Sequence, residues 1–370
     1  MSNVAAPKAG VFVAPAKRDL AILARQLVDW LGAHMPGASN IKVENLEYPM
    51  GAGQSHETIL FDASWDERGQ RRERGLVVRI KPTTFTVFQD DMFVEQYRLM
   101  RVLREGGKVR VAETLWFEED PSILGAPFFV MEKLVGRVAV SIPSYMETGW
   151  VCEATPAERA RLWENGVRQL AAIQSVPLES VGFLARPEVG DGFEQEWDRW
   201  SRFLTMIRSV RPLPFHEAVW DTLEKSRPDN RPPGLAWGDA RLGNMMVGDD
   251  FDILAVMDWE QPSLGGALQD LGWWLFSDRM KVLVRGGEPL AGLGGRDETI
   301  ALWSGITGIS TAGIDWYEAF AGFKMGCLHV HMQDMKNQPP PEGDFADTPA
   351  SLELARMLGL PRGSANWAGR

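Results

Sequence analysis

Residues 235–260 read L-A-W-G-D-A-R-L-G-N-M-M-V-G-D-D-F-D-I-L-A-V-M-D-W-E, and they carry the strongest structural pattern in this 370-residue chain. Two short apolar runs, one after Asn244 and one at 253–257, predict neighbouring strands. Polar side chains stand where these runs begin and end: Asp239 and Asn244 come before the first, and Asp258 follows the second. A hairpin of the two strands would bring Asn244 and Asp258 together, with Asp239 on the preceding loop.

These three side chains have the chemistry of a phosphoryl-transfer site. Mg²⁺ prefers hard oxygen ligands, usually one or two from protein side chains and the rest from water and nucleotide phosphates. Asn244 and Asp258 could supply the protein ligands, and Asp239 could accept the proton of a hydroxyl group that attacks a γ-phosphate. Taken singly, an Asx-turn, a capping Asn and a surface Asp are the commoner interpretations. The combined spacing favours the catalytic one.

The pattern G-D-x-x-x-x-N, followed by a strand that ends in Asp-Trp-Glu, resembles the catalytic and metal-binding motifs of the aminoglycoside phosphotransferase and choline kinase-like family. The resemblance implies a small-molecule kinase that uses Mg²⁺ and ATP, or GTP, with Asp239 as catalytic base and Asn244 and Asp258 as metal ligands. The family usually has His before Gly-Asp, whereas this chain has Trp237, as in a bacterial subgroup. Asp270, in a stretch similar to a family helix start, is expected to brace the catalytic loop.

Upstream, a glycine-containing loop lies between two predicted strands. The loop G-A-G-Q-S-H-E-T, residues 51–58, resembles the Gly-Gln-Ser-Asn loop of related kinases, with His56 in place of Asn. Backbone N–H groups in such a turn can approach phosphates. The resemblance implies that Gly53 and Ser55 contact the β-phosphate, although a plain hairpin turn has the same composition.

The next strand, residues 76–80, is expected to carry the cation that pairs with the α- and β-phosphates. Alternation places Val77 and Arg79 on one face, and the family position is often Lys. Arginine can bind phosphate bidentately with a permanent charge, so Arg79 is the candidate. A solvent-facing strand arginine is the alternative. Its helical partner is left open between Glu95 and Gln96.

Between the two predicted halves, P-F-F-V-M-E-K-L-V-G, residues 127–136, resembles the family's strand-and-hinge segment. By that resemblance the carbonyl of Glu132 and the N–H of Leu134 would bind the edge of adenine. The alternative is a buried strand followed by a linker.

Hydrophobic periodicity predicts a β-rich half followed by a helical half. We expect an α+β, protein-kinase-like two-lobed fold, with an N-terminal antiparallel five-stranded sheet plus one helix and a mainly helical C-terminal lobe. Residues 1–17 should be a mobile arm, 18–134 a nucleotide-binding lobe with a leading helix, and 135–370 a catalytic and acceptor-binding lobe that contains a short two-stranded insertion. The predicted strands are 41–48, 57–65, 76–80, 113–118 and 128–134. The predicted helices are 20–31, 90–104, 156–174, 194–207, 216–225, 268–283, 299–302 and 316–335.

Composition limits the classes of partner molecule and the cellular compartment that we expect for this protein. The formal net charge of −11 argues against nucleic acid, which is bound by clusters of Lys and Arg. No apolar run is long enough to span a bilayer and the start of the chain lacks a secretory pattern, so we expect a cytosolic protein without a membrane partner. The two cysteines, Cys152 and Cys327, are too few for a disulfide framework.

The acceptor is the least specified feature. A small-molecule hydroxyl is expected, and an aminoglycoside, which would imply antibiotic resistance, is the family name and not a deduction. A hydroxyacyl-CoA or other catabolic alcohol is an equal alternative, because related kinase domains occur beside acyl-CoA dehydrogenases. A nucleotide-binding pseudokinase is the rival from another class. A protein kinase is disfavoured, since Asp-Phe-Gly and Ala-Pro-Glu motifs are missing from the sequence.

Overall fold

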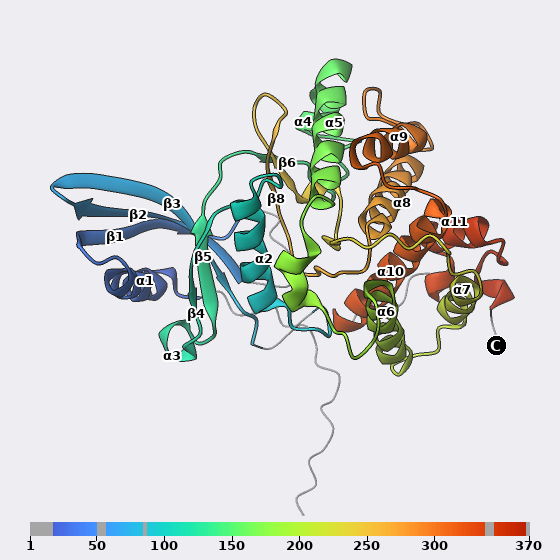
Figure 1. Cartoon of the computed structure of the whole chain (residues 1–370), viewed down its shortest axis with the longest axis horizontal. Coiled ribbons are helices and arrows are strands. Elements are labelled where there is room, and N and C mark those ends of the chain that lie inside the picture. Colours follow the sequence, from blue (N-terminus) through green and yellow to red (C-terminus); the bar gives the residue numbers. More distant parts are fainter. Residues whose placement is uncertain (1–17, 50–56, 84–86, 337–343, 368–370) are drawn as a thin grey trace, which may run out of the picture.

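The computed structural model describes residues 18–49, 57–83, 87–336 and 344–367, and it places a twisted sheet beside a larger helical body (Figure 1). The sheet has the strand order β1-β2-β3-β5-β4, and every neighbouring pair is antiparallel. The predicted α+β class and two-lobed arrangement are therefore confirmed. The strands are β1 Ala38–Glu47, β2 Glu57–Glu67, β3 Gln70–Ile80, β4 Thr114–Glu118 and β5 Phe128–Glu132.

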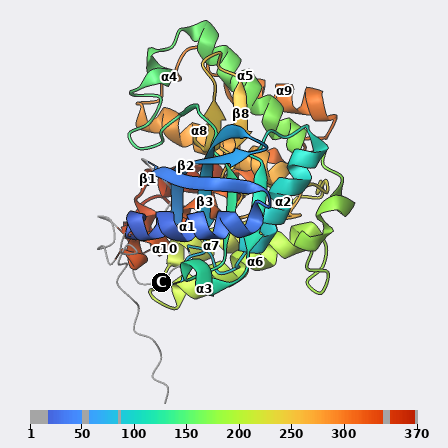
Figure 2. The same cartoon turned by 90° about the vertical axis from the view of Figure 1, so that its left-hand side faces the viewer.

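Helix α1 (Leu20–His34) covers the face of the sheet that is turned away from the helical body (Figures 1 and 2). Asp19 caps its first turn by accepting the backbone N–H groups of Ala21 and Ile22. The apolar stripe of the helix, which includes Leu27 and Trp30, packs on inward strand residues to form a small core.

Helix α2 (Phe93–Gly106) lies on the opposite side of the sheet and joins it to the helical body (Figure 1). Its first turns pack on β5, because the rings of Phe93 and Tyr97 lie 5.3 and 5.8 Å from the ring of Phe129. Its last turns, with Leu99 and Leu103, belong to the core of the helical body instead. Because α2 contributes to both halves, a lobe boundary near Leu134 stays a prediction.

The helical body is built around aromatic side chains and two closely packed helices, α8 and α10. Gly272 of α8 allows the close approach, since a Cβ atom there would lie 2.5 Å from the backbone of Tyr317. Trp237, Trp259 and Trp303 are fully buried nearby. The helices are α4 Trp150–Glu153, α5 Pro156–Ile173, η1 Leu178–Leu184, α6 Gly192–Arg208, α7 Pro214–Lys225, α8 Leu268–Val284, α9 Arg296–Thr307, α10 Ile314–Met335, η3 Asp344–Ala346, α11 Pro349–Leu358 and η4 Ser364–Asn366.

The insertion in the helical body has three strands, not the predicted two. β6 (Arg137–Val138) pairs with β7 (Met245–Val247), which pairs with β8 (Ile253–Val256). Two residues are too few to show an alternating pattern, so β6 was missed. The short α3 (Pro121–Leu124) and α4 and the longer α11 were also not predicted.

Three smaller expectations concern the first residues of the chain, membrane-spanning segments and the cysteines. The arm at residues 1–17 lies outside the described residues. Within the described residues, no helix is both long and apolar enough to cross a membrane. Cys152 and Cys327 are unpaired, and only Cys327 is fully buried.

Acid should destabilise the fold through His216 of α7. Burial, helped by the nearby His329, lowers the pKa of His216 from 6.5 to about 4. The unfolded chain then binds a proton between pH 6.5 and 4 that the folded chain refuses. The free energy of unfolding should fall by about 3 kcal/mol from this site as pH drops through that window. Urea denaturation of wild type and His216→Asn at several pH values would show a shallower pH slope in the variant, and equal slopes would contradict the assignment.

Candidate active site

Asp239 lies on the loop before η2 (Leu242–Asn244), and three side chains hold its carboxylate. Arg241 Nε lies 3.0 Å from both oxygens, Asn244 Nδ2 donates to Oδ2 at 2.7 Å, and Trp273 Nε1 donates to Oδ1 at 2.9 Å. The carboxylate remains 30% exposed, so a ligand can reach it. This side chain is therefore fixed in orientation and open to solvent.

The antiparallel pairing of β7 and β8 brings Asn244 beside the residue that precedes Asp258. The N–H of Met257 donates to the carbonyl of Asn244 at 2.8 Å. The chain then turns sharply, because Asp258 has a φ of 61°, in the left-handed region that few side chains adopt. Asp239, Asn244 and Asp258 are thus brought to one place, as the hairpin expectation required.

Negative charge accumulates around Asp258. Its pKa is raised well above the usual range, first by burial and then by the neighbouring carboxylates of Glu260 and Asp239, while Arg79 opposes the shift. Carboxylates at or below a partly open surface, together with the amide of Asn244, form a donor set that suits a hard cation such as Mg²⁺. Within the described residues, no group of three His, Cys, Asp or Glu side chains could hold a metal by itself. A metal here would therefore need further oxygens from water or phosphate.

Arg79 of β3 reaches across to the helical body. It pairs with Phe129 of β5 across the sheet, so its side chain lies on the face that α2 covers. Its Nη2 donates to Glu260 Oε1 at 2.7 Å, and both side chains are largely buried. Arg79, which was expected to pair with a residue of α2, thus pairs with Glu260, which follows β8. Gln96 is the inward residue of α2, and its buried amide bonds to nothing in the described chain.

The remaining candidates for nucleotide binding are only partly placed. Glu132 ends β5, and its carboxylate accepts the N–H of Glu113 at 2.8 Å. Two residues later, the N–H of Leu134 donates to no acceptor among the described residues. Gly53 and Ser55 lie outside the described residues, so their contact with phosphate stays a prediction.

Trp237, the departure from the usual His, ties the two halves of the site together. Its buried indole N–H donates to the carbonyl of Met257 at 2.8 Å, directly before Asp258. Gly238, which follows, has a φ of 103°, and a Cβ there would lie 2.3 Å from the carbonyl oxygen of Gln261. The Trp thus has a structural role, and Gly is required next to it.

Comparison with known proteins places this geometry in a family. The family model described as the Phosphotransferase enzyme family matches residues 52–304, well over half of the chain. The chain belongs to this family. The match includes β3, the segment between β5 and β6, the loop that carries Asp239 and the β7–β8 hairpin.

The curated proteins that match this chain are longer than the chain itself. Acyl-CoA dehydrogenase family member 11 of Pongo abelii is 24% identical over 315 residues, which cover 81% of this chain and 38% of that protein. Acyl-CoA dehydrogenase family member 10 of Mus musculus is 26% identical over 266 residues, covering 70% and 22%. The chain thus spans less than two fifths of the length of these relatives.

Solved structures share the fold of this family member. A candidate aminoglycoside phosphotransferase of Ralstonia eutropha superposes with a TM-score of 0.64 at 23% identity, covering 90% of this chain and 95% of that one. A choline kinase of Streptococcus pneumoniae gives 0.55 at 12% identity, covering 91% and 99%. A thermostable mutant of the aminoglycoside phosphotransferase APH(4)-Ia, solved with ADP and hygromycin B, gives 0.53 at 13% identity, covering 91% and 98%. Nucleotide-bound relatives therefore have this fold.

The expected brace at Asp270 of α8 is confirmed. Its carboxylate accepts the N–H of Trp237 at 2.6 Å and the N–H of Gly238 at 2.9 Å. Burial raises its pKa to about 6, and these two hydrogen bonds and Lys324 oppose the shift. Lys324 is itself buried and donates to Glu196 at 3.3 Å. The loop that carries Asp239 is thus anchored to α8.

Removal of this brace should destabilise the whole fold. Asp270→Ala leaves two N–H groups without an acceptor, and each buried loss costs about 1–3 kcal/mol. We expect the free energy of unfolding, measured by urea denaturation at pH 7.5, to fall by at least about 2 kcal/mol. Asp221→Ala, on the exposed side of α7, should stay within about 0.5 kcal/mol of wild type. Equal stability of the two variants would contradict the bracing role.

Sequence reasoning missed three side chains that shape the site: Arg241, Glu260 and Trp273. Arg241 and Glu260 stand inside the 235–260 stretch, so their polarity at the ends of apolar runs was a usable signal. Trp273 follows Asp270 by one turn of α8, and helical spacing could have placed both on the same side.

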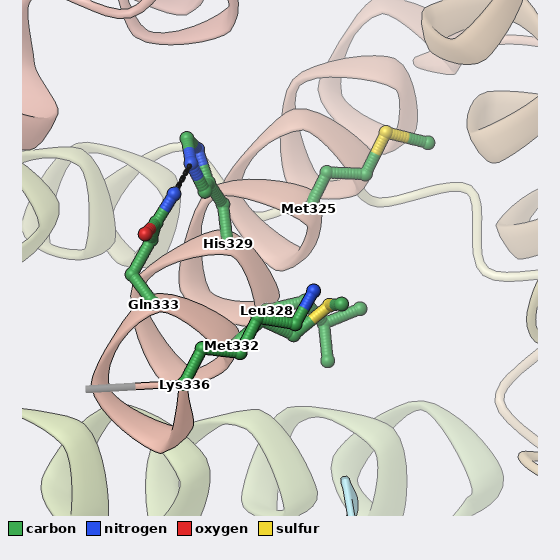
Figure 3. Close-up of a pocket in the computed structure, with 6 residues that line it drawn as sticks. All are labelled: Met325, Leu328, His329, Met332, Gln333 and Lys336. Carbon is green, nitrogen blue, oxygen red and sulfur yellow. Dashed lines mark hydrogen bonds between the residues drawn. The ribbon is translucent and has the colours of Figure 1, made fainter. Parts of the chain in front are cut away.

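A hollow of about 280 Å³ lies elsewhere, along the C-terminal half of α10 (Figure 3). It is lined by Met325, Leu328, His329, Met332, Gln333 and Lys336. Gln333 Nε2 donates to His329 Nε2 at 3.2 Å on its wall. None of the candidate catalytic residues lines it, so this hollow is separate from the site.

Proposed function

We propose that the chain is a small-molecule kinase that transfers the γ-phosphate of ATP, or GTP, to a hydroxyl group of its acceptor. The observation that carries the proposal is the meeting of Asp239, Asn244 and Asp258 at the ends of β7 and β8, with Arg79 close by through Glu260. Membership of the Phosphotransferase enzyme family supports it. Residues 18–134 would bind the nucleotide, and 135–370 would supply the catalytic residues and bind the acceptor.

Asp239 would act as the catalytic base. Trp273 and Asn244 hold one oxygen each of its carboxylate, which fixes the direction of the remaining lone pairs. As the acceptor oxygen bonds to the γ-phosphorus, the bond from that phosphorus to the bridging oxygen of the leaving nucleotide breaks. The hydroxyl proton passes to Asp239. The contribution of the chain is therefore orientation and removal of one proton.

Asn244 and Asp258 would hold Mg²⁺ through their side-chain oxygens. A bound Mg²⁺ supplies charge that stabilises the phosphate oxygens during transfer. Arg79 would contact the α- and β-phosphates, held in place by Glu260. The carbonyl of Glu132 and the N–H of Leu134 would bind adenine, and the loop with Gly53 and Ser55 would meet the β-phosphate.

The acceptor is proposed only as a small alcohol. Hygromycin B is bound in a structure of APH(4)-Ia, and the Streptococcus pneumoniae protein is a choline kinase, so aminoglycosides and choline-like alcohols both belong in the first assay. Because the curated relatives are named as acyl-CoA dehydrogenases, hydroxyacyl-CoA compounds are included in the assay as well. With a formal net charge of −11, nucleic acid is not proposed as a partner.

The proposal is tested by ³¹P NMR of the purified protein with Mg-ATP and pooled alcohols: aminoglycosides, macrolides, hydroxyacyl-CoAs and choline-like amines. A new phosphomonoester signal that disappears in Asp239→Ala is expected. Nucleotide binding without any new phosphomonoester across all pools would favour the pseudokinase instead.

A further inference from the structure

Arg241 lies directly on the carboxylate of the proposed base. Its Nε contacts both oxygens of Asp239, and its Nη1 donates to Ser141 Oγ at 2.7 Å. Its Nη2 donates to no acceptor among the described residues, and the side chain is 28% exposed. The guanidinium thus retains free donors at a partly exposed position beside Asp239.

A second cation stands behind Arg241. Lys281 of α8 is partly buried, and this burial lowers its pKa, while the carboxylates of Asp278 and Asp239 raise it and Arg241 lowers it further. Tyr145 Oη donates to Asp278 at 3.2 Å, which occupies one of these carboxylates. Arg241 and Lys281 thus place two cations beside Asp239, and both would repel a polycationic acceptor at this point.

Apolar side chains flank the same point. Ser141, which contacts Arg241, stands between Val140 and Ile142, and these are 55% and 90% exposed. Large aliphatic side chains left this open beside a candidate catalytic loop offer an apolar surface to a ligand. The immediate surroundings of Asp239 thus combine an arginine with free donors and an aliphatic surface.

We propose that Arg241 binds an anionic group of the acceptor, so that the acceptor is an alcohol with a carboxylate or phosphate and an apolar body. This inference rests on the proposed kinase function. When an anionic group of the acceptor also binds the guanidinium, Arg241 holds the Asp239 carboxylate less tightly. One oxygen of Asp239 then becomes available to the acceptor hydroxyl. A polycationic aminosugar brings no anionic group to Arg241 and is repelled by its charge.

The test is calorimetric binding of matched ligands in the presence of Mg²⁺ and AMP-PNP. The ligands are 3-hydroxyoctanoate, 3-hydroxyoctyl phosphate, methyl 3-hydroxyoctanoate and kanamycin. Both anionic alcohols should bind at least about 10-fold more tightly than the ester and kanamycin, because a hydrogen bond to a charged group is worth about 1.5–3 kcal/mol. The stronger of the two anions identifies the acceptor's group as carboxylate or phosphate.

Variants separate recognition from support of Asp239. Arg241→Gln should weaken binding of the anionic alcohols about 10- to 100-fold and of the ester less than about threefold. Arg241→Lys should restore part of the loss. Arg168→Gln, an exposed arginine of α5 that pairs with Glu164, should change nothing. Circular dichroism confirms that each variant is folded.

Several results would overturn the inference. These are equal or tighter binding of the ester or kanamycin, equal losses for all ligands in Arg241→Gln, and no binding of either anion at millimolar concentration. Phosphoryl transfer is measured separately with the same ligands. Transfer without anion preference would refute the role of Arg241 and leave the kinase proposal intact. Anion-selective binding without transfer to any acceptor would support the role of Arg241 and refute the kinase proposal.

Discussion

Asp239→Asn is expected to lower kcat for phosphoryl transfer by about 10²- to 10⁴-fold, the usual contribution of a positioned base. Asparagine has the same shape and can still accept the indole N–H of Trp273, which lies 2.9 Å from the carboxylate. It cannot accept a proton at neutral pH. Binding of Mg-ATP should therefore change by less than about threefold, because on this assignment Asp239 meets the acceptor and not the nucleotide.

The measurement for Asp239→Asn combines ADP release with fluorescence titration of a labelled nucleotide. Asp252→Asn is the matched control, since Asp252 lies in the β7–β8 turn and pairs with Arg110 at an exposed position. It should keep wild-type kcat and nucleotide affinity. If Asp239→Asn retained more than a tenth of the activity, Asp239 would not be the base.

Asp258→Asn should show the second large effect, a loss of activity of about 10²- to 10³-fold together with a raised requirement for Mg²⁺. The substitution removes the charge of a proposed metal ligand. It also removes a buried carboxylate that Glu260 and Asp239 repel, and Asn tolerates the left-handed φ of 61°. The free energy of unfolding should therefore stay the same or rise while activity is lost, as expected where function is maintained at the expense of stability.

Activity as a function of Mg²⁺ concentration, beside urea denaturation in EDTA, measures both effects of Asp258→Asn. Asp249→Asn, at a fully exposed position in the same hairpin, serves as control and should match wild type in both. A variant that loses activity only because it unfolds would contradict the ligand assignment. So would full activity at the wild-type Mg²⁺ requirement.

Local sequence patterns predicted the elements that hold the site. The five strands of the sheet and the helices α1, α2 and α5–α10 were predicted from apolar periodicity, with ends displaced by a few residues, because burial of one face enforces a period of two or 3.6. Three of the missed elements have the same origin. β6 has two residues and α3 and α4 have four each, and segments so short contain no full period.

The partners within the site were less predictable than its members. Arg79 was expected to pair with α2, but it reaches Glu260, which is 181 residues away in the sequence. Gln96 was correctly considered as the inward residue, yet nothing in the helix pattern showed that its amide would lack a partner. The role of Trp237 depends on the carbonyl of Met257, which only strand pairing brings close.

The sequence by itself determined the family, the two-lobed fold and the candidates Asp239, Asn244 and Asp258, because these depend on residue types at short, fixed spacings. The tertiary structure decided what surrounds them: Trp273 and Arg241 on Asp239, Glu260 on Arg79, and Asp270 beneath the catalytic loop. Apart from Arg241, which is two residues from Asp239, these contacts join residues far apart in the chain. They depend on how whole helices and strands pack, and no local period encodes that packing.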